Sequence, residues 1–417
     1  MGVVTPPVSP TVRCLCSAAV PSGAEHRDVD LLDGAFYVSD PYPTYAWMRD
    51  HAPLYWDATN ELWGVSRYDD VVEVETRKEV FTSADRTKGG YRPNLPADPA
   101  LIGLDDPEHH RRRNLVARRF TPRAIGSWEG HVRAVVTELL DGVAAGGGHG
   151  DAVDDLGAPL PAKMIGRLLG FADDRWQDLQ GWSERTIALG GGPRYLNDDG
   201  MVAAMEFAQA AADLHGAKRR CPADDLMTVW ATAEVDGAPL PIEAVIADSL
   251  LLLDGGAETT RTVIARSLVE LSARPDQWAL LQTGIDLACA TEELIRFVTP
   301  IHNMCRVATT DTTVGGRPVP AGSQLILMYA SANRDPAHFA DPERMDLTRR
   351  PNHHLSFGFG THFCLGAALA RLEIRVFLEE LTRRVRDVRV VPGTVVEMPN
   401  AFVYGLRSAR VELDFVA

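Results

Sequence analysis

The segment Phe357-Gly-Phe-Gly-Thr-His-Phe-Cys364-Leu-Gly366 places one cysteine in a glycine-rich loop directly before a predicted helix. Residues 367–373, which follow, have high helix propensity and contain neither glycine nor proline. Cys364 is therefore predicted to lie at a helix N-terminus, where free N–H groups and the helix dipole favour a thiolate. The three glycines leave room for a flat, bulky group beside the sulfur. Such a cysteine is suited to bind a metal through one strong bond.

Cys364 has two other interpretations, as a buried hydrophobic residue or as a zinc ligand. A lone cysteine near a helix start is often just a small buried hydrophobic residue. A tetrahedral zinc site would need three further ligands at characteristic spacing. The remaining cysteines offer a single C-x-C pair far from the loop; they are Cys14, Cys16, Cys221, Cys289 and Cys305.

The loop as a whole resembles the haem-binding loop of the cytochrome P450 family. Every fixed position of its pattern F-x-x-G-x-x-x-C-x-G is present, from Phe357 to Gly366. The resemblance implies heme b (iron protoporphyrin IX) as the cofactor, with Cys364 as the metal ligand and Phe357 beside it. An axial thiolate pushes electron density toward bound oxygen and favours O–O cleavage. The resemblance also implies a mainly α fold with a small β region, the cytochrome P450 fold.

Composition sets the broad class. The chain has 417 residues, of which 45% are hydrophobic and 24% charged, as expected for a globular protein with a large core. The formal net charge of −15 argues against nucleic acid as a partner. Six scattered cysteines do not form a disulfide framework, so we expect a reducing, cytoplasmic location. Length alone predicts two or three domains.

The first residues are interpreted as a flexible tail over 1–27. Their apolar patch, 14–20, is too short to span a bilayer, and it lacks the long apolar core of a secretory signal. We therefore expect no membrane insertion. The resemblance covers the rest of the chain and implies one catalytic domain over 28–417, in place of the several domains expected from length.

Helical periodicity dominates from residue 109 onward, and short strands are predicted near both ends of the chain. One long apolar helix is predicted over 241–274, ending before Pro275. A shorter helix over 42–51 is predicted to have Asp40 as its N-cap. Two loops rich in glycine and proline interrupt the pattern, at 87–106 and 190–200.

The long helix contains the second informative stretch, Asp254-Gly-Gly-Ala-Glu258-Thr259. Two glycines inside a helix cost about 1 kcal/mol each relative to alanine, which is tolerated where a ligand approaches the backbone. The Thr259 hydroxyl can bond the Gly255 carbonyl, and we expect this bond to open a local bulge. A solvent-facing polar cluster is the alternative. The stretch resembles the oxygen-activating helix of the family, which implies that Glu258 and Thr259 handle protons. Asp254 and Ala257 stand at variable positions.

A third pattern is Glu293-Leu-Ile-Arg296, a pair on one helix face. Alone it is an ordinary ion pair worth less than about 1 kcal/mol. The resemblance implies a structural role, in which the pair is completed by Arg344 of the segment Pro342-Glu-Arg-Met345.

Cations are needed for the two propionates of a haem. Residues 105–113 resemble the family element D-x-P-x-H-x-x-x-R, in which His109 and Arg113 lie four apart on one helix face. The resemblance implies that these two residues, with Arg306 and His362, bind the cofactor.

The chain contains no flavin or iron–sulfur motif, so electrons are expected from a separate ferredoxin-type donor with its reductase. An acidic donor requires a local basic patch on this acidic chain. The candidates, each of which could instead belong to a solvated helix face, are Arg111, Arg112, Arg118, Arg119 and Arg371. We expect a monomer.

The substrate is expected to be hydrophobic. The glycine- and proline-rich segments 87–102 and 190–200 match the family's variable substrate-access regions. The predicted pocket walls, of which Leu252 and Phe402 could equally be core residues, are Tyr91, Leu252, Gly255, Ile301, His302 and Phe402. Stretches similar to the bacterial sterol side-chain hydroxylases favour a steroid or other polycyclic isoprenoid; they are 30–37, 89–93, 303–307 and 331–334. A polyketide, macrolide or fatty-acid-like natural product is the alternative substrate.

The resemblance predicts a monooxygenase that uses O2 to hydroxylate an unactivated C–H bond of a large hydrophobic molecule. A peroxide-driven enzyme and a non-catalytic haem-binding sensor are the alternatives. The pair Glu258–Thr259 argues against both, because neither alternative needs a proton relay.

Overall fold

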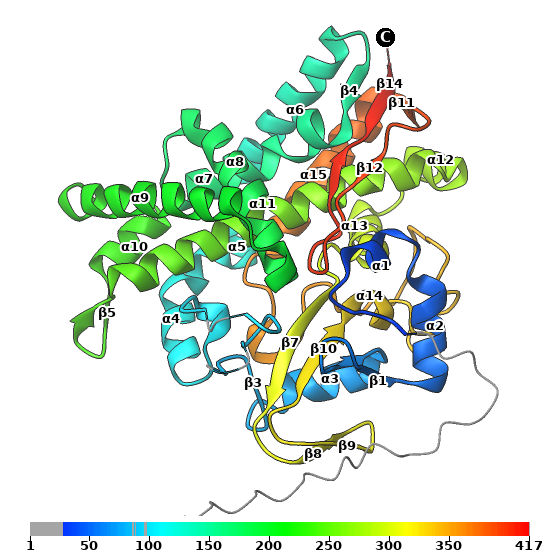
Figure 1. The fold of residues 1–417 in the computed structure, drawn as a ribbon. Coiled ribbons are helices and arrows are strands. Elements are labelled where there is room, and N and C mark those ends of the chain that lie inside the picture. The colour runs from blue at the N-terminus through cyan, green and yellow to red at the C-terminus, as the bar shows by residue number, and fades with distance from the viewer. Residues whose placement is uncertain (1–27, 86, 88, 96–97, 417) are drawn as a thin grey trace, which may run out of the picture.

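The computed structural model describes residues 28–85, 87, 89–95 and 98–416. The expected tail over 1–27, with Cys14 and Cys16, lies outside these residues. Helices dominate the rest, so the predicted mainly α class with a small β region is confirmed (Figure 1). The α-helices are α1 (Gly34–Val38), α2 (Tyr42–His51), α3 (Tyr68–Thr76), α4 (Glu108–Ala117), α5 (Pro122–Gly126), α6 (Glu129–Ala145), α7 (Pro159–Leu169), α8 (Trp176–Ile187), α9 (Asp198–Arg220), α10 (Leu226–Thr232), α11 (Ile242–Ser272), α12 (Pro275–Gln282), α13 (Leu287–Val298), α14 (Tyr329–Ala332) and α15 (Ala367–Arg384).

Helix α11 is the centre of the helical part, and it contacts α7, α8, α9, α13 and α15 (Figure 1). Its second half is buried on almost every side, from Ala257 to Leu268. The charged residues in this half, among them Arg261 and Arg266, are buried in ion pairs. The predicted long helix is therefore confirmed, and it lies inside the protein because other helices cover it.

The main sheet has the strand order β1-β2-β10-β7-β3 and lies beside α1, α2 and α3 (Figure 1). Strand β10 pairs in parallel with β2, while the other neighbours are antiparallel. Its strands are β1 (Leu54–Asp57), β2 (Leu62–Val65), β3 (Phe81–Thr82), β7 (Asn303–Ala308) and β10 (Gln324–Met328). The remaining strands form small sheets; they are β4 (His149–Asp151), β5 (Glu234–Val235), β6 (Ala238–Pro239), β8 (Thr312–Val314), β9 (Arg317–Val319), β11 (Val385–Val390), β12 (Val396–Glu397), β13 (Leu406–Ser408) and β14 (Arg410–Phe415).

The helix over 42–51 is present, but the predicted cap is wrong. Asp40 has a φ of 58°, and Pro41 occupies the N-cap position without a side-chain hydrogen bond. The proline itself, with its fixed φ, begins the helix. Helix α3 escaped prediction, because its buried residues Tyr68, Val71 and Val74 alternate with acidic ones over only nine residues.

Among the described residues, no helix is both long and apolar enough to cross a bilayer.

Candidate active site

A cavity of about 530 Å³ separates α11 from the segment that carries Cys364. This volume lies in the usual range for ligand pockets. Most of the wall is apolar and comes from α7, α8, α11 and α15 and the loops between strands. Its larger apolar residues include Leu101, Ile165, Ile187, Leu250, Val263 and Phe402.

Cys364 lines the cavity and precedes α15, which begins at Ala367 as the sequence predicts. Its own N–H donates to the Phe357 carbonyl at 2.9 Å. Burial raises the pKa of the thiol, while the N–H groups of Gly366 and Ala367 and the charge of Arg113 oppose that shift. The helix terminus alone therefore does not make a thiolate here. A bound metal cation would supply the missing stabilisation, because metal binding displaces the proton of a coordinating thiol.

The cysteine loop is fastened to α3 by Glu75, a residue the sequence did not indicate. The Phe359 N–H donates to Glu75 Oε2 at 2.5 Å, and the Tyr329 hydroxyl donates to Oε1. Gly360 has a φ of +67°, and a Cβ there would lie 2.7 Å from the Glu75 carbonyl oxygen. Glycine is thus required for the loop to lie against α3.

Three of the predicted cofactor-binding residues with nitrogen donors line the cavity, namely Arg113, Arg306 and His362. Arg113 Nη2 donates to the Phe363 carbonyl at 2.6 Å, and Arg306 Nη2 lies 3.5 Å from Glu75 Oε1. Burial, with the neighbouring Arg306 charge, lowers the pKa of His362 to about 2, so its ring is neutral at ordinary pH.

His109 is buried behind His362, with ring centroids 4.3 Å apart, and is not itself part of the cavity wall. Among the described residues neither of its ring nitrogens has a hydrogen bond of normal geometry, although Nδ1 lies 3.6 Å from Asp106 Oδ1. A buried nitrogen without a hydrogen bond is costly, so Nε2 in particular calls for a partner. A sulfur ligand, two cavity arginines, the cavity histidine His362 and the buried His109 together fit a haem with its two carboxylates.

Thr259 and Gly255 face the cavity from α11. The Thr259 hydroxyl donates to the Gly255 carbonyl at 2.8 Å, which confirms the predicted bond. A Cβ on Gly255 would meet no atom within 4 Å, so the glycine leaves open space at this wall. The expected bulge is absent, since α11 continues as an α-helix to Ser272. A single back-bond to a carbonyl is too weak to open a helix packed on all sides.

Glu258 points away from the cavity. Its carboxylate pairs with Arg261 at 3.1 Å, and Arg261 also pairs with Glu184 at 3.1 Å. Glu184 is 44% exposed, so this chain of charges connects the buried helix to the surface. Burial raises the pKa of Glu258 despite the arginine. Unlike Thr259, Glu258 therefore does not line the cavity.

Five of the six predicted substrate-pocket residues line the cavity: Tyr91, Leu252, Gly255, Ile301 and Phe402. His302 does not, because its ring stacks on Tyr37 with centroids 4.2 Å apart inside the core. Sequence reasoning missed Asp98 and Asp254, which also line the cavity. For Asp254 the available signal was an acidic residue within an apolar helical run, whereas Asp98 lies in a loop and gave no such signal.

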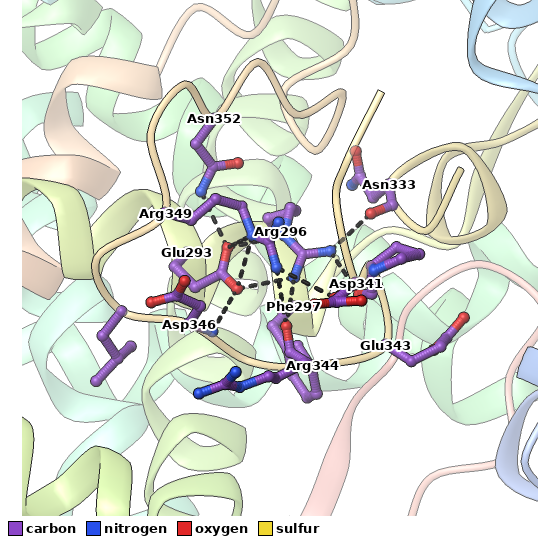
Figure 2. Close-up of polar contacts among 12 residues, drawn as sticks. Glu293, Arg296, Phe297, Asn333, Asp341, Glu343, Arg344, Asp346, Arg349 and Asn352 are labelled. Atoms are coloured by element: carbon purple, nitrogen blue, oxygen red, sulfur yellow. Dashed lines mark hydrogen bonds and ion pairs between the residues drawn. The ribbon is translucent and has the colours of Figure 1, made fainter. Parts of the chain in front are cut away.

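The structural pair is present, but its partner differs from the prediction. Glu293 and Arg296 are joined by two hydrogen bonds of 2.8 Å with no exposure to solvent. The third member is Arg349, whose Nε lies 3.1 Å from Glu293 Oε2. Arg344 contributes only its carbonyl oxygen, to Arg296 and Arg349, while its side chain is exposed (Figure 2). The loop turns between Arg344 and Arg349, so that only the Arg349 side chain points inward.

Four of the five arginines proposed for docking form an ion pair with a neighbouring carboxylate. Arg112 is buried and pairs with Asp248 at 2.6 Å, so it is not a surface residue. Arg371 is bound by Glu292, and Arg119 by Asp224 at 2.7 Å. Arg111 is exposed but pairs with Asp236 at 3.0 Å. Arg118 is exposed, and no ion pair involves it within the described residues.

Comparison with known proteins agrees with this architecture. The family model for cytochrome P450 matches residues 199–409. A steroid C26-monooxygenase of Mycobacterium tuberculosis is 40% identical over 93% of this chain and 97% of its own length. Linalool 8-monooxygenase of Pseudomonas putida is 32% identical over 89% of this chain and 95% of its own.

Solved structures show the same fold. A Mycobacterium marinum cytochrome P450 in complex with pseudoionone aligns with a TM-score of 0.85 at 32% identity, covering 94% of this chain and 100% of that one. A Bacillus megaterium enzyme in complex with testosterone aligns with a TM-score of 0.81 at 32% identity, covering 89% of this chain and 97% of that one. The chain therefore belongs to the cytochrome P450 family and is a haem-dependent monooxygenase.

Proposed function

We propose that this enzyme hydroxylates an unactivated C–H bond of a steroid or another polycyclic isoprenoid. The observation that carries the proposal is the large apolar cavity between Cys364 and the Gly255–Thr259 face of α11. Three relatives that match most of this chain are named steroid C26-monooxygenases. Testosterone and the terpenoid pseudoionone occupy two structures of the same fold.

In this proposal Cys364 binds the iron of heme b, and Phe357 packs beside the sulfur. The carboxylates of the haem are held by Arg113, Arg306, His362 and His109. The first three line the cavity, and the buried Nε2 of His109 has no hydrogen bond among the described residues. Glu293, Arg296 and Arg349 hold the loop beneath the site. When bound, the haem activates O2 with two electrons and two protons, so that one oxygen atom enters the substrate.

Thr259 and Glu258 are proposed to supply the protons. The Thr259 hydroxyl already faces the cavity and is oriented by the Gly255 carbonyl. Glu258 is linked through Arg261 to the exposed Glu184, which supports a route from solvent. In this proposal the Glu258 side chain turns away from Arg261 and carries its carboxyl proton toward the Thr259 hydroxyl. The apolar walls exclude water, which strengthens each polar interaction inside the cavity.

Electrons are proposed to arrive from a separate ferredoxin-type protein with its reductase, as no redox motif other than the Cys364 loop occurs in the sequence. Phe359 and Phe363, on either side of the loop, are 42% and 40% exposed and offer an apolar contact near the sulfur. Arg118, an exposed arginine without an ion pair among the described residues, is proposed to meet an acidic donor. We propose a monomer in the cytoplasm.

The test begins with the ferrous–CO spectrum of the purified protein, which reports sulfur ligation of the haem. A spectral titration with sterols, terpenoids, macrolides and fatty acids then identifies ligands, and product analysis with a ferredoxin and reductase follows. We expect the strongest spin-state change and oxidised product with a steroid or terpenoid. A macrolide or fatty acid as the only oxidised ligand would overturn the substrate class. Haem binding without turnover of any ligand would favour a sensor.

A further inference from the structure

One carboxyl group in the cavity wall has no part in the proposed mechanism. Asp254 follows the apolar run Leu250–Leu253 on α11 and directly precedes Gly255. The side chain is half-buried and lines the cavity, so its accessible part faces the ligand space. A carboxyl group in an apolar wall is costly unless it has a polar partner.

Its one partner of normal geometry is Thr186 on α8. Thr186 Oγ1 lies 2.8 Å from Asp254 Oδ1 and 2.7 Å from the Trp182 carbonyl oxygen. A hydroxyl group has a single proton, and a carbonyl can only accept. When that proton goes to Trp182, the contact with Asp254 is a hydrogen bond only if the carboxyl is protonated.

The surroundings favour the protonated form. No basic side chain pairs with Asp254 within the part of the chain that the structure describes. Burial and the nearby carboxyl groups of Glu258 and Asp98 raise its pKa well above the usual range. The buried Ser183 hydroxyl lies close enough to oppose this shift, but makes no hydrogen bond of normal geometry.

Asp254 therefore offers the cavity a neutral carboxyl group that can both donate and accept. One oxygen is engaged by Thr186, and Oδ2 has no hydrogen bond to a described residue. A cationic ligand is less suited to this wall, because it would have to ionise the carboxyl. A cationic ligand would also meet Arg92, a buried guanidinium in the cavity wall. The Gly190 and Asn303 carbonyls hold it, and it has no carboxylate partner among the described residues.

We propose that Asp254, positioned by Thr186, binds a hydroxyl or carbonyl oxygen of the substrate. The inference rests on the proposed function and specifies its ligand. Asp254 precedes Thr259 by five residues, which is about 7.5 Å along a helix. The bound oxygen function thus lies near the reacting part of the substrate. This favours a molecule with an oxygen function in its middle over one whose single polar group lies at the far end.

The test uses small ligands that bind haem iron directly, so that binding does not depend on the unknown substrate. The probes are 4-phenylimidazole, its three hydroxyphenyl isomers and the matching aminophenyl compounds. We expect one hydroxyphenyl isomer to bind the wild type about tenfold more tightly than the parent, as measured by spectral titration. Asp254→Leu should erase that preference, because it removes donor and acceptor while filling the space.

Two milder variants and one control sharpen the result. Asp254→Asn should keep part of the preference, since an amide also donates and accepts. Thr186→Val should weaken it about threefold, because the carboxyl loses its fixed orientation. The control is Asp213→Asn, an exposed acid on α9, which should bind every probe as the wild type does.

The outcomes separate this inference from the proposed function. If the ferrous–CO spectrum is normal but the parent compound and all hydroxyphenyl isomers bind equally well, the proposed role of Asp254 is overturned and the proposed haem site is not. So would a preference that survives Asp254→Leu, or a stronger preference for an aminophenyl compound. Absence of the thiolate-type spectrum in the wild type would instead overturn the proposed haem site.

Discussion

The Arg349 guanidinium lies 3.1 Å from the Glu293 carboxylate, and both side chains are buried. Glu293 also receives the Asp346 N–H at 2.8 Å and the Asn352 side chain at 3.1 Å, so one carboxylate organises the loop from Asp346 to Asn352 (Figure 2). This loop leads directly to the cysteine segment. The position of Cys364 thus depends on a charge cluster that is remote from the cavity.

Removing Arg349 should be far more damaging than removing Arg344. Arg349→Ala leaves Glu293 with one fewer cation in a buried site, and we expect a loss of about 3 kcal/mol in the free energy of unfolding. Arg344→Ala keeps the carbonyl that Arg296 uses, and should cost less than about 1 kcal/mol. Urea denaturation and haem content measure both effects. Equal losses in the two variants would contradict the assignment.

The Thr259 hydroxyl should matter for oxidation and not for ligand binding. In Thr259→Ala we expect product per reducing equivalent to fall about tenfold, with peroxide released instead, because the oriented hydroxyl at the cavity wall is lost. The dissociation constant of the ligand should change less than about twofold. Thr259→Ser keeps a hydroxyl and serves as the control. Intact product yield in the alanine variant would rule out the relay.

Glu373 should make stability fall as pH rises. Burial raises its pKa to about 8, and it lines the cavity with one carboxyl oxygen unpartnered. Between its unfolded pKa near 4.5 and about 8, the folded protein holds a proton that the unfolded chain has released. The free energy of unfolding therefore decreases with pH across this window, by up to about 1.4 kcal/mol per unit.

The comparison with Glu373→Gln isolates this contribution. Glutamine cannot ionise, so the variant should gain stability relative to the wild type as pH rises from 5 to 8, with little difference near pH 4.5. Denaturant midpoints of both proteins across this range provide the measurement. A constant difference between them would show that Glu373 does not titrate there.

Arg118 should contribute to binding of the electron donor. Arg118→Glu reverses an exposed charge in the short helix Arg118–Phe120, which contacts α15, and we expect the KM for an acidic ferredoxin to rise about fivefold at low salt. The effect should shrink as ionic strength increases. Arg386→Glu, an exposed arginine on β11, is the matched control. An equal rise in both variants would indicate a general charge effect without a specific surface.

Much of the fold and site followed from local sequence. The cysteine before α15, the bond from Thr259 to Gly255 and the long helix α11 all depend on residues within one or two turns of each other. Local propensity and periodicity determine such features directly. The short helix α3 was missed because neither signal is strong over nine residues.

What the sequence determined is therefore the set of local elements and the chemical groups they carry. The tertiary structure decided which of those groups meet. It placed Arg349 instead of Arg344 on Glu293, stacked His302 on Tyr37, and turned Glu258 toward Arg261 while Asp254 faces the cavity. The contacts of Arg349 with Glu293 and of His302 with Tyr37 join segments far apart in the chain, and the rotation of α11 in its packing decides which of its side chains face the cavity. No short sequence window contains that information.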